Sequence, residues 1–191
     1  MEKIGRREIF TTKADVTQEF LDKHVFYLRT LYDVSRDIYA HVETDKILRK
    51  FLLMSMGNFG CKRGFIILAS NPSLNIEHFL TLGYVDEEKD ALNEICAEIL
   101  QQEHPTEFDA FLDVSGFTRA SSRTELMMTF LVESEWQGIF GLGSRLIDGG
   151  YSAGDQEVLS TLINNLGVAL KNAKSFEEIK KLNQDLNRKN I

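Results

Sequence analysis

The sequence is poor in the residues and segments that would assign it to a secreted or membrane class. It has two cysteines, two prolines and one tryptophan in 191 residues. Two cysteines do not make a disulfide framework, which indicates a reducing compartment. The longest strongly apolar run, residues 65–69, is far too short to span a bilayer, and the charged start shows no secretion signal. We therefore predict a soluble, cytoplasmic protein.

Motifs for catalysis and metal binding are also missing. No Gly-x-x-x-x-Gly-Lys phosphate loop occurs, and the four histidines, at positions 24, 41, 78 and 104, show no ligand spacing. We predict no metal site and no catalytic residue, and the sequence names no cofactor. His78, on the apolar side of an expected strand, is either a satisfied core or edge histidine or a contact to haem or another ligand.

Positive charge is scarce as well. The net charge is −7, and residues 86–109 contain nine acidic residues but only one lysine, Lys89, and no arginine. This balance argues against nucleic acid as the main partner. The basic residues between 171 and 189 are expected on the solvated outside of a paired helix.

The clearest pattern present is one long helix over residues 152–191. Ser152 and Asp155 have the spacing of a capping box, and apolar residues then recur at helical spacing. The stripe thins to Ile179, Leu182 and Leu186, the three-and-four spacing of a coiled-coil seam. Such a helix would be roughly 55 to 60 Å long at 1.5 Å per residue. Its end should therefore extend beyond the domain.

A second candidate pairing helix covers residues 15–40. Leu21, Leu28, Leu31 and Ile38 follow one heptad seam, and a neighbouring row of Val25, Tyr32 and Tyr39 supplies further apolar surface. The helix can thus touch both a partner and its own domain. We predict a homodimer held by residues of the two long helices: Leu21, Leu28, Leu31, Ile38, Leu166, Ala173, Ile179, Leu182 and Leu186.

The middle of the chain alternates between helices and strands. A helix from about residue 44 to the Gly57–Gly60 turn is followed by two strands, 64–70 and 74–82, that form a hairpin. A helix beginning at Asp86 comes next, then one short strand within 107–123 and a second hairpin with arms 125–132 and 137–147. Gly138, Gly141 and Gly143 in the last arm indicate a bulge or a close backbone approach. Antiparallel strands between helices indicate an α+β domain with one central sheet.

Two stretches of this pattern resemble a known family. Residues 131–173, with Gly138-Ile-Phe-Gly-Leu-Gly143, then Tyr151-Ser-Ala-Gly-Asp155 and a helix, look like the last third of a GAF domain. The helix at 31–59 leading into Gly64-Phe-Ile-Ile-Leu68 is similar to the start of one. The resemblance covers about residues 30–175. It implies an antiparallel sheet of about six strands flanked by helices, in a sensing or dimerising module of signalling proteins.

The resemblance also suggests how the chain is organised. We expect a disordered lead-in at residues 1–14, a GAF-like domain at 15–175 that includes the N-terminal helix, and a coiled-coil-like signalling helix at 176–191. The expected function is a small-molecule-sensing regulatory domain. It would dimerise and relay a signal through its C-terminal helix to an output domain such as a histidine kinase, cyclase or transcriptional activator. No output domain follows residue 173, so we expect a fragment of a larger protein or a stand-alone adaptor.

If a ligand pocket exists, the resemblance places it between the sheet and the central helix with its adjoining loops. The candidates there are Phe79, Tyr84, Cys96, Phe108, Phe111, Phe117, Arg119 and Met128. Each aromatic is either a ligand contact or simply core, and Arg119 would meet an anionic ligand.

The sequence does not carry the signatures of known ligand-binding subclasses. It lacks the Asn-Lys pair of the cyclic-nucleotide group and the Cys-His pair of the bilin group. Two alternatives to a sensor stay open. One is a ligand-free dimerisation or spacer module, and the other is a free-methionine sulfoxide reductase-like enzyme, favoured only by the two cysteines.

Overall fold

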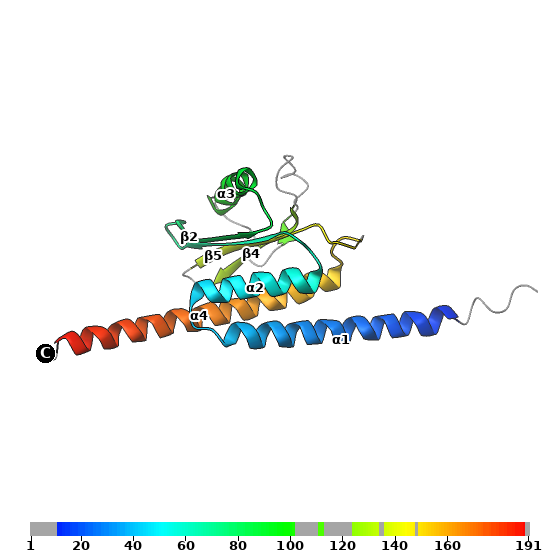
Figure 1. The fold of residues 1–191 in the computed structure, drawn as a ribbon, viewed down its shortest axis with the longest axis horizontal. Helices are drawn as coiled ribbons and strands as arrows, with labels where there is room; N and C mark the ends of the chain where they lie inside the picture. Colours follow the sequence, from blue (N-terminus) through cyan, green and yellow to red (C-terminus); the bar gives the residue numbers. More distant parts are fainter. Residues whose placement is uncertain (1–10, 102–110, 113–123, 134–135, 148, 190–191) are drawn as a thin grey trace, which may run out of the picture.

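The computed structural model describes residues 11–101, 111–112, 124–133, 136–147 and 149–189 (Figure 1). Its elements are, in chain order, α1 (Thr11–Tyr39), α2 (Thr44–Phe59), β1 (Gly64–Ser70), β2 (Ile76–Leu82), α3 (Asp86–Gln101), β3 (Phe111–Leu112), β4 (Thr124–Val132), β5 (Trp136–Gly143) and α4 (Ala153–Lys189). This is the expected order of helices and strands, and the α+β class is confirmed.

Several boundaries differ from the expected ones: β2 starts at Ile76 rather than at residue 74, and β4 starts one residue earlier than expected, at Thr124. Helix α1 begins at Thr11 rather than at Asp15, so the end of the expected lead-in is helical. Strand β5 starts at Trp136, which the sequence pattern places in the turn, and ends at Gly143 rather than near Ile147. Element ends are the least certain part of a pattern-based prediction because the period fades there.

The strands form one antiparallel sheet in the order β2-β1-β5-β4-β3. The described residues supply five strands, where the resemblance implies about six. Strands β1 and β5 lie at the centre of the sheet, and their residues are buried along nearly the whole of both strands. This position explains the uninterrupted apolar run of β1, because both faces of a central strand are covered.

Two glycines of β5 make room for aromatic rings on the two faces of the sheet. A Cβ atom on Gly138 would lie 2.2 Å from the ring of Phe130, and one on Gly141 would lie 2.1 Å from the ring of Phe65. Phe130 belongs to the core on one face and Phe65 to the core on the other. The close approach predicted for the β5 glycines is therefore confirmed at these two positions.

Helices cover the two faces of the sheet unequally (Figure 1). Helix α3 lies alone on one face, where Leu92, Cys96, Ile99 and Leu100 pack against β1, β4 and β5. Helices α2 and α4 pack on the opposite face, and α1 packs against α2 and α4 on the side away from the sheet. The larger core lies on this second face and includes Phe51, Phe140 and Leu166.

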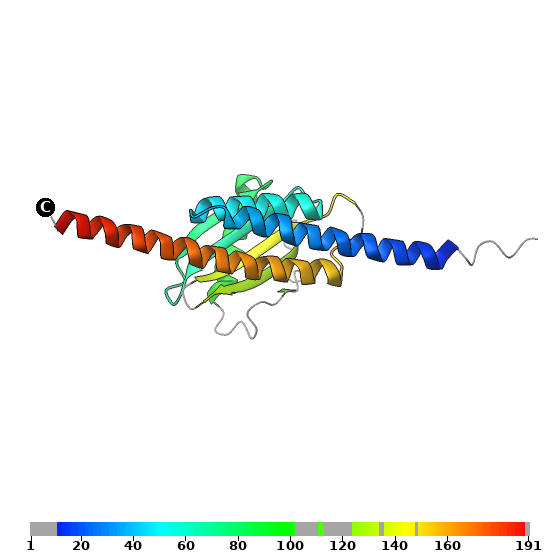
Figure 2. The same ribbon diagram turned by 90° about the horizontal axis from the view of Figure 1, so that it is seen from below.

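The two long helices run in the same direction but are staggered along their length. The hydroxyl of Tyr27 in α1 donates to Asp155 at the start of α4, and Asn165, further along α4, donates to Ser35, further along α1. Their outer ends therefore overhang the body at opposite ends, as Figure 2 shows from below. From residue 175 to residue 188 every side chain of α4 is exposed.

The predicted capping box starts α4. The backbone N–H of Ser152 donates to the Asp155 carboxylate at 2.8 Å, and the N–H of Asp155 donates to the Ser152 hydroxyl at 3.2 Å. From there α4 is one helix of 37 residues. None of the helices in the described part of the chain has the length and apolar character that spanning a membrane requires.

Candidate functional site

The predicted ligand contacts do not gather in one place. Tyr84 and Cys96 belong to the core on the α3 face, whereas Met128 and Phe111 belong to the core on the face of the other helices. Phe79 stands opposite Ile67 in the sheet, hence on the α3 face, and is partly exposed. Phe108, Phe117 and Arg119 lie outside the described residues. The sheet thus separates Met128 and Phe111 from the pocket proposed for them.

The α3 face is apolar and contains few polar groups. The hydroxyl of Tyr84 lies 3.1 Å from that of Thr124, and burial raises the pKa of Tyr84 to about 12. The guanidinium of Arg63 lies over the Tyr84 ring, 5.6 Å from its centroid, and pairs with Glu88 at 2.7 Å. Through Arg63, directly before β1, these contacts connect the first turn of α3 to Tyr84 in the β2–α3 loop, and Tyr84 in turn contacts the start of β4.

Thr129 provides the one polar group on this face without a partner among the described residues. It pairs in register with Ile139, which belongs to the α3-side core, so its side chain points to the same face. Thr129 is buried, and its hydroxyl oxygen makes no hydrogen bond. A buried hydroxyl without a partner is unfavourable, and it is the kind of group that a bound molecule would satisfy.

A cavity of about 290 Å³ opens at the β3–β4 edge of the sheet. It curves around this edge, because Leu112 and Met127 belong to the α3 face while Phe111 and Leu126 belong to the other. The remaining lining residues are Glu125 of β4, Gly150 and Tyr151 of the loop before α4, and Gln156 in the first turn of α4. Its volume is at the lower limit for small-molecule sites. Among the predicted ligand contacts that the structure describes, Phe111 alone lines this cavity.

Both cysteines are buried and have no disulfide partner. Burial raises the pKa of the Cys96 thiol to about 12 and raises that of Cys61 as well. Because the thiolate is the reactive form, neither thiol is activated at neutral pH. Within the described residues no group of three or more histidine, cysteine or carboxylate side chains is placed to hold a metal ion.

The structure divides the predicted dimer residues into two groups. Ile38, Leu166 and Ala173 are buried in the core of the single chain, and Leu31 packs against that core. This corrects their assignment to a surface between chains, because their own chain already covers them. Leu21, Leu28, Ile179, Leu182 and Leu186 are exposed, each by more than half of its surface.

Most of the exposed apolar side chains form a second stripe on each long helix, with Phe26 and Phe176 lying outside it. On α1 this stripe is Leu21, Val25, Leu28, Tyr32 and Tyr39, and on α4 it is Val168, Ile179, Leu182 and Leu186. At about 100° per residue, each stripe lies roughly opposite the side of its helix that is buried. We call these residues the outer stripes. Val25, Tyr32 and Tyr39 are the row that the sequence pattern marks as secondary, and Val168 was missed.

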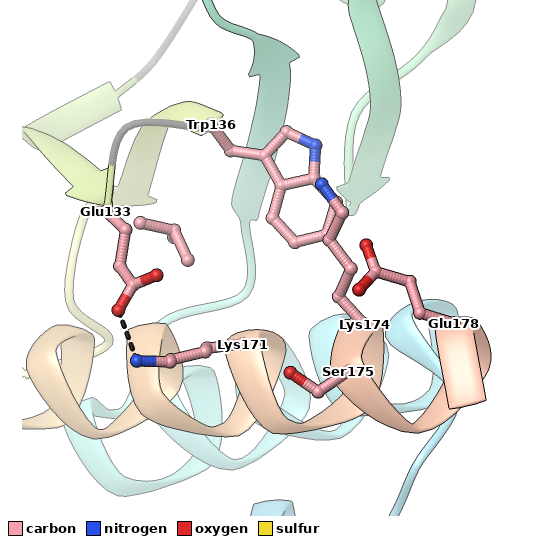
Figure 3. A pocket seen from close by; sticks show the side chains of 7 residues that line it. Glu133, Trp136, Lys171, Lys174, Ser175 and Glu178 are labelled. Atoms are coloured by element: carbon pink, nitrogen blue, oxygen red, sulfur yellow. Dashed lines mark hydrogen bonds and ion pairs between the residues drawn. The ribbon is translucent and has the colours of Figure 1, made fainter.

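Glu133, directly after β4, and Trp136, at the start of β5, meet α4 where it leaves the body (Figure 3). Glu133 forms an ion pair with Lys171. Trp136 lies under the ammonium group of Lys174, 5.0 Å from the ring centroid, and its indole N–H donates to Glu77 of β2 at 2.7 Å. We call these five residues the exit cluster. Lys171 and Lys174 flank Ala173, the last buried residue of α4.

At its other end α4 is fixed by Asp155, whose side chain is almost completely buried. Its carboxylate accepts hydrogen bonds from Ser152 and Tyr27 and pairs with Arg145 at 3.1 Å. Burial acts to raise the pKa of Asp155, but the hydrogen bonds of Ser152, followed by Tyr27 and the charge of Arg145, outweigh it and leave the pKa below its usual value.

Comparison of the sequence with models of known families gives no match, and comparison with curated proteins gives none either. A comparison of folds does find similar structures. The crystal structure of a GAF domain assigned to a sensor histidine kinase of Pseudomonas syringae pv. tomato superposes with a TM-score of 0.62 at 12% sequence identity, over 86% of this chain and 98% of that one. This chain has the GAF fold.

Within this GAF fold, sequence reasoning located the outer ends of both long helices but not the exit cluster. Glu133 and Trp136 were placed in a turn, and nothing in their spacing pointed to α4. The partners are far apart in the sequence, since Glu133 and Lys171 are 38 positions apart and Glu77 and Trp136 are 59. The only local signals were one tryptophan beside a hairpin turn and two lysines three residues apart on α4.

Proposed function

We propose that this GAF-fold chain is a regulatory module that pairs with a second copy and relays a signal along α4. The observation that carries the proposal is the pair of outer stripes. Both long helices are apolar on two opposite sides, and the chain itself covers only one side of each. Contiguous exposed apolar surface of this kind marks an interaction site.

A second copy of the chain is the occupant that the pattern favours. From residue 168 onward the positions 168, 172, 175, 179, 182 and 186 keep heptad spacing; Val168, Ile179, Leu182 and Leu186 are apolar, whereas Asn172 and Ser175 between them are polar. Ile179 and Leu186 occupy position a of the heptad, and Leu182 occupies position d. A β-branched residue at a with Leu at d, as at Ile179 and Leu182, is typical of parallel two-stranded coiled coils. The overhanging end of α4 would then be covered by its own copy rather than by the body.

The proposed sensing site is the α3 face of the sheet. Its apolar wall, the Tyr84 hydroxyl and the unpartnered Thr129 hydroxyl suit a small, largely apolar ligand with one hydrogen-bonding group. The output would be a further domain such as a histidine kinase, a cyclase or a transcriptional activator. The buried, unactivated thiols support a regulatory role rather than thiol redox catalysis.

A ligand-free dimerisation or spacer module is the second candidate. It is favoured by the close packing of the α3 face, where Phe65, Ile67 and Cys96 are fully buried without any ligand. In that case the input would come from a neighbouring domain, and only the outer stripes would matter for function.

A thermal-shift screen separates the two candidates. Ligand at a hundredfold over its dissociation constant adds about 2.7 kcal/mol, which raises the midpoint by roughly 5 to 10 °C for a chain of this size. We expect such a shift from one member of a library of small, largely apolar molecules with one hydrogen-bonding group, screened beside cyclic nucleotides, carboxylates and haem, and we expect the shift to be lost in Thr129→Val. If no compound raises the unfolding midpoint, the result favours the ligand-free dimerisation or spacer module.

Sedimentation tests the pairing itself. We expect a dimer at tens of micromolar and a monomer for Leu182→Lys. Lys180→Glu also changes a charge on the exposed part of α4 but lies off the outer stripe, so it should remain dimeric. A monomeric native chain would overturn the pairing proposal.

A further inference from the structure

The exit cluster is the last place where the body holds α4. Beyond Lys174 the described side chains of α4 up to residue 188 are exposed. The contacts of Lys171 with Glu133 and of Lys174 with Trp136 are therefore the last ones through which the described part of the body can act on the direction of the rest of α4.

The body's contribution to this cluster comes from two strands and from the residue that directly follows a third. Glu77 lies in β2 at the point where the β1–β2 register shifts, between the pairs Leu68–His78 and Ala69–Ile76. Glu133 follows Val132, the last residue of β4, and Trp136 starts β5. Glu133 and Trp136 contact α4 directly (Figure 3), whereas Glu77 reaches it only through its hydrogen bond with Trp136.

The backbone of this corner is under strain. Glu133 has φ of 53°, a left-handed conformation that residues other than glycine adopt at a cost in free energy. In this conformation its carboxylate forms the ion pair with Lys171. Strained residues persist where surrounding contacts hold them, and they gather at switch regions.

The contacts themselves are weak and reversible. The Glu133–Lys171 pair is about half exposed on both sides, and exposed pairs contribute little to stability. The indole of Trp136, by contrast, is buried and hydrogen-bonded to Glu77. The strand side of the cluster is thus fixed, whereas the α4 side can be released without unfolding the core.

From these observations we infer that the exit cluster is a clamp by which the sheet sets the direction of α4. Glu77, Glu133 and Trp136 are its fixed side, and Lys171 and Lys174 are the positioning residues on α4. The inference deepens the proposed function, since it names the contacts through which a change in the sheet would reach the outgoing helix.

Distances between spin labels test the clamp directly. One label goes on Arg49→Cys in α2 and the other on Asn183→Cys in α4, both exposed positions, while the native Cys61 and Cys96 are buried. Excess unlabelled chain restricts the measurement to distances within one chain. We expect a single narrow distribution for the otherwise native chain, and a distribution at least twice as wide for Lys171→Met with Lys174→Met.

Lys180→Met with Lys181→Met is the matched control, because it removes two lysines from exposed positions further along the same helix. It should reproduce the native distribution. A charge exchange provides the second variant: Glu133→Lys should broaden the distribution, and adding Lys171→Glu should narrow it again. Clamp variants that overlay the native distribution, or an exchange that restores nothing, would overturn the inference.

The outcome does not depend on the test of the proposed function, since the measurement uses no ligand and reads one chain at a time. If no compound shifts the unfolding midpoint but the spin-label distances of the clamp variants broaden, the sensor proposal is wrong and the clamp proposal stands. If a ligand is found but the distances of the clamp variants stay as narrow as in the native chain, the sensor proposal stands and the clamp proposal is wrong. The single tryptophan gives an independent check, because acrylamide quenching of its fluorescence reports on Trp136 alone and should increase in Lys171→Met with Lys174→Met.

Discussion

The carboxylate of Asp155 connects α1, the loop before α4 and α4 itself. Its pKa is lower in the folded chain than the value of about 3.9 expected in the unfolded chain. The charged form therefore stabilises the fold above about pH 4, and this contribution is lost as the pH falls through the folded pKa.

Asp155→Asn should lower the free energy of unfolding by about 1 to 3 kcal/mol at pH 7, the range for hydrogen bonds to a buried charge. Urea unfolding of both proteins between pH 7 and pH 3 measures the difference, which should narrow below about pH 4. Asp185→Asn, at an exposed position of α4, is the control and should change little. A difference that stays constant down to pH 3 would contradict the role of the charge.

Gly141 tests the packing of the α3 face. A methyl group there would meet the ring of Phe65, which is fully buried and cannot move away freely. Gly141→Ala should therefore destabilise the fold by about 1 to 3 kcal/mol. Gly57→Ala, in helix α2 where nothing lies within 4 Å of the new Cβ, should be neutral or stabilise by up to about 1 kcal/mol. Equal effects at both positions in thermal unfolding would rule out the steric explanation.

At the scale of elements, α4 consists of a part that belongs to the core and a part that does not. A chain that stops after Ser175 loses only residues whose described side chains are exposed. Its free energy of unfolding should stay within about 1 kcal/mol of the full chain. A chain that stops after Val168 also loses Leu170 and Ala173 from the core, and the loss of Leu170 alone should remove about 2 to 5 kcal/mol.

Urea unfolding compares these two truncations with the full chain at a protein concentration low enough that all three are monomeric, so that pairing does not contribute. Under these conditions a loss of several kcal/mol from the first one would mean that the end of α4 packs on the body. A small loss from the second would contradict the core assignment of Leu170.

The long helices also show how far sequence alone could go. The helical period gives two apolar stripes on α1, one with Leu31 and Ile38 and one with Val25 and Tyr32, but not which of them faces inward. That choice depends on the shape of the α2–α4 surface that α1 meets, which no local pattern records. The element order, the capping box and the overhang of α4 follow from local spacing, and these predictions are confirmed.

The predicted pocket shows the same limit in the sheet. Period two places Met127 and Met128 on opposite faces of β4, but only the packed fold shows which face α3 covers. Met128 therefore lies on the face away from α3, whereas Met127 and Thr129, which the sequence pattern did not single out, lie on the α3 face. The resemblance gave the position of the pocket relative to the sheet, not the direction of each side chain.

At the scale of the whole molecule, the parallel course of α1 and α4 gives the chain an entry end and an exit end. A pair of copies can relay a signal along this axis only if both exits point the same way. The charges of the α4 end favour that arrangement. Glu178 and Asp185 flank the seam on the same side, so in an antiparallel pair like charges would face each other across it.

Disulfide trapping decides the orientation. In a parallel pair every seam position lies opposite its own copy, so Ile179→Cys, Leu182→Cys and Leu186→Cys should all cross-link under mild oxidation. In an antiparallel pair only a position near the crossing point meets itself, so at most one of the three would. Lys180→Cys, off the outer stripe, is the control for random collision. Cross-linking at all three seam positions without cross-linking at 180 would establish that two chains enter and leave side by side, which the proposed relay along α4 requires.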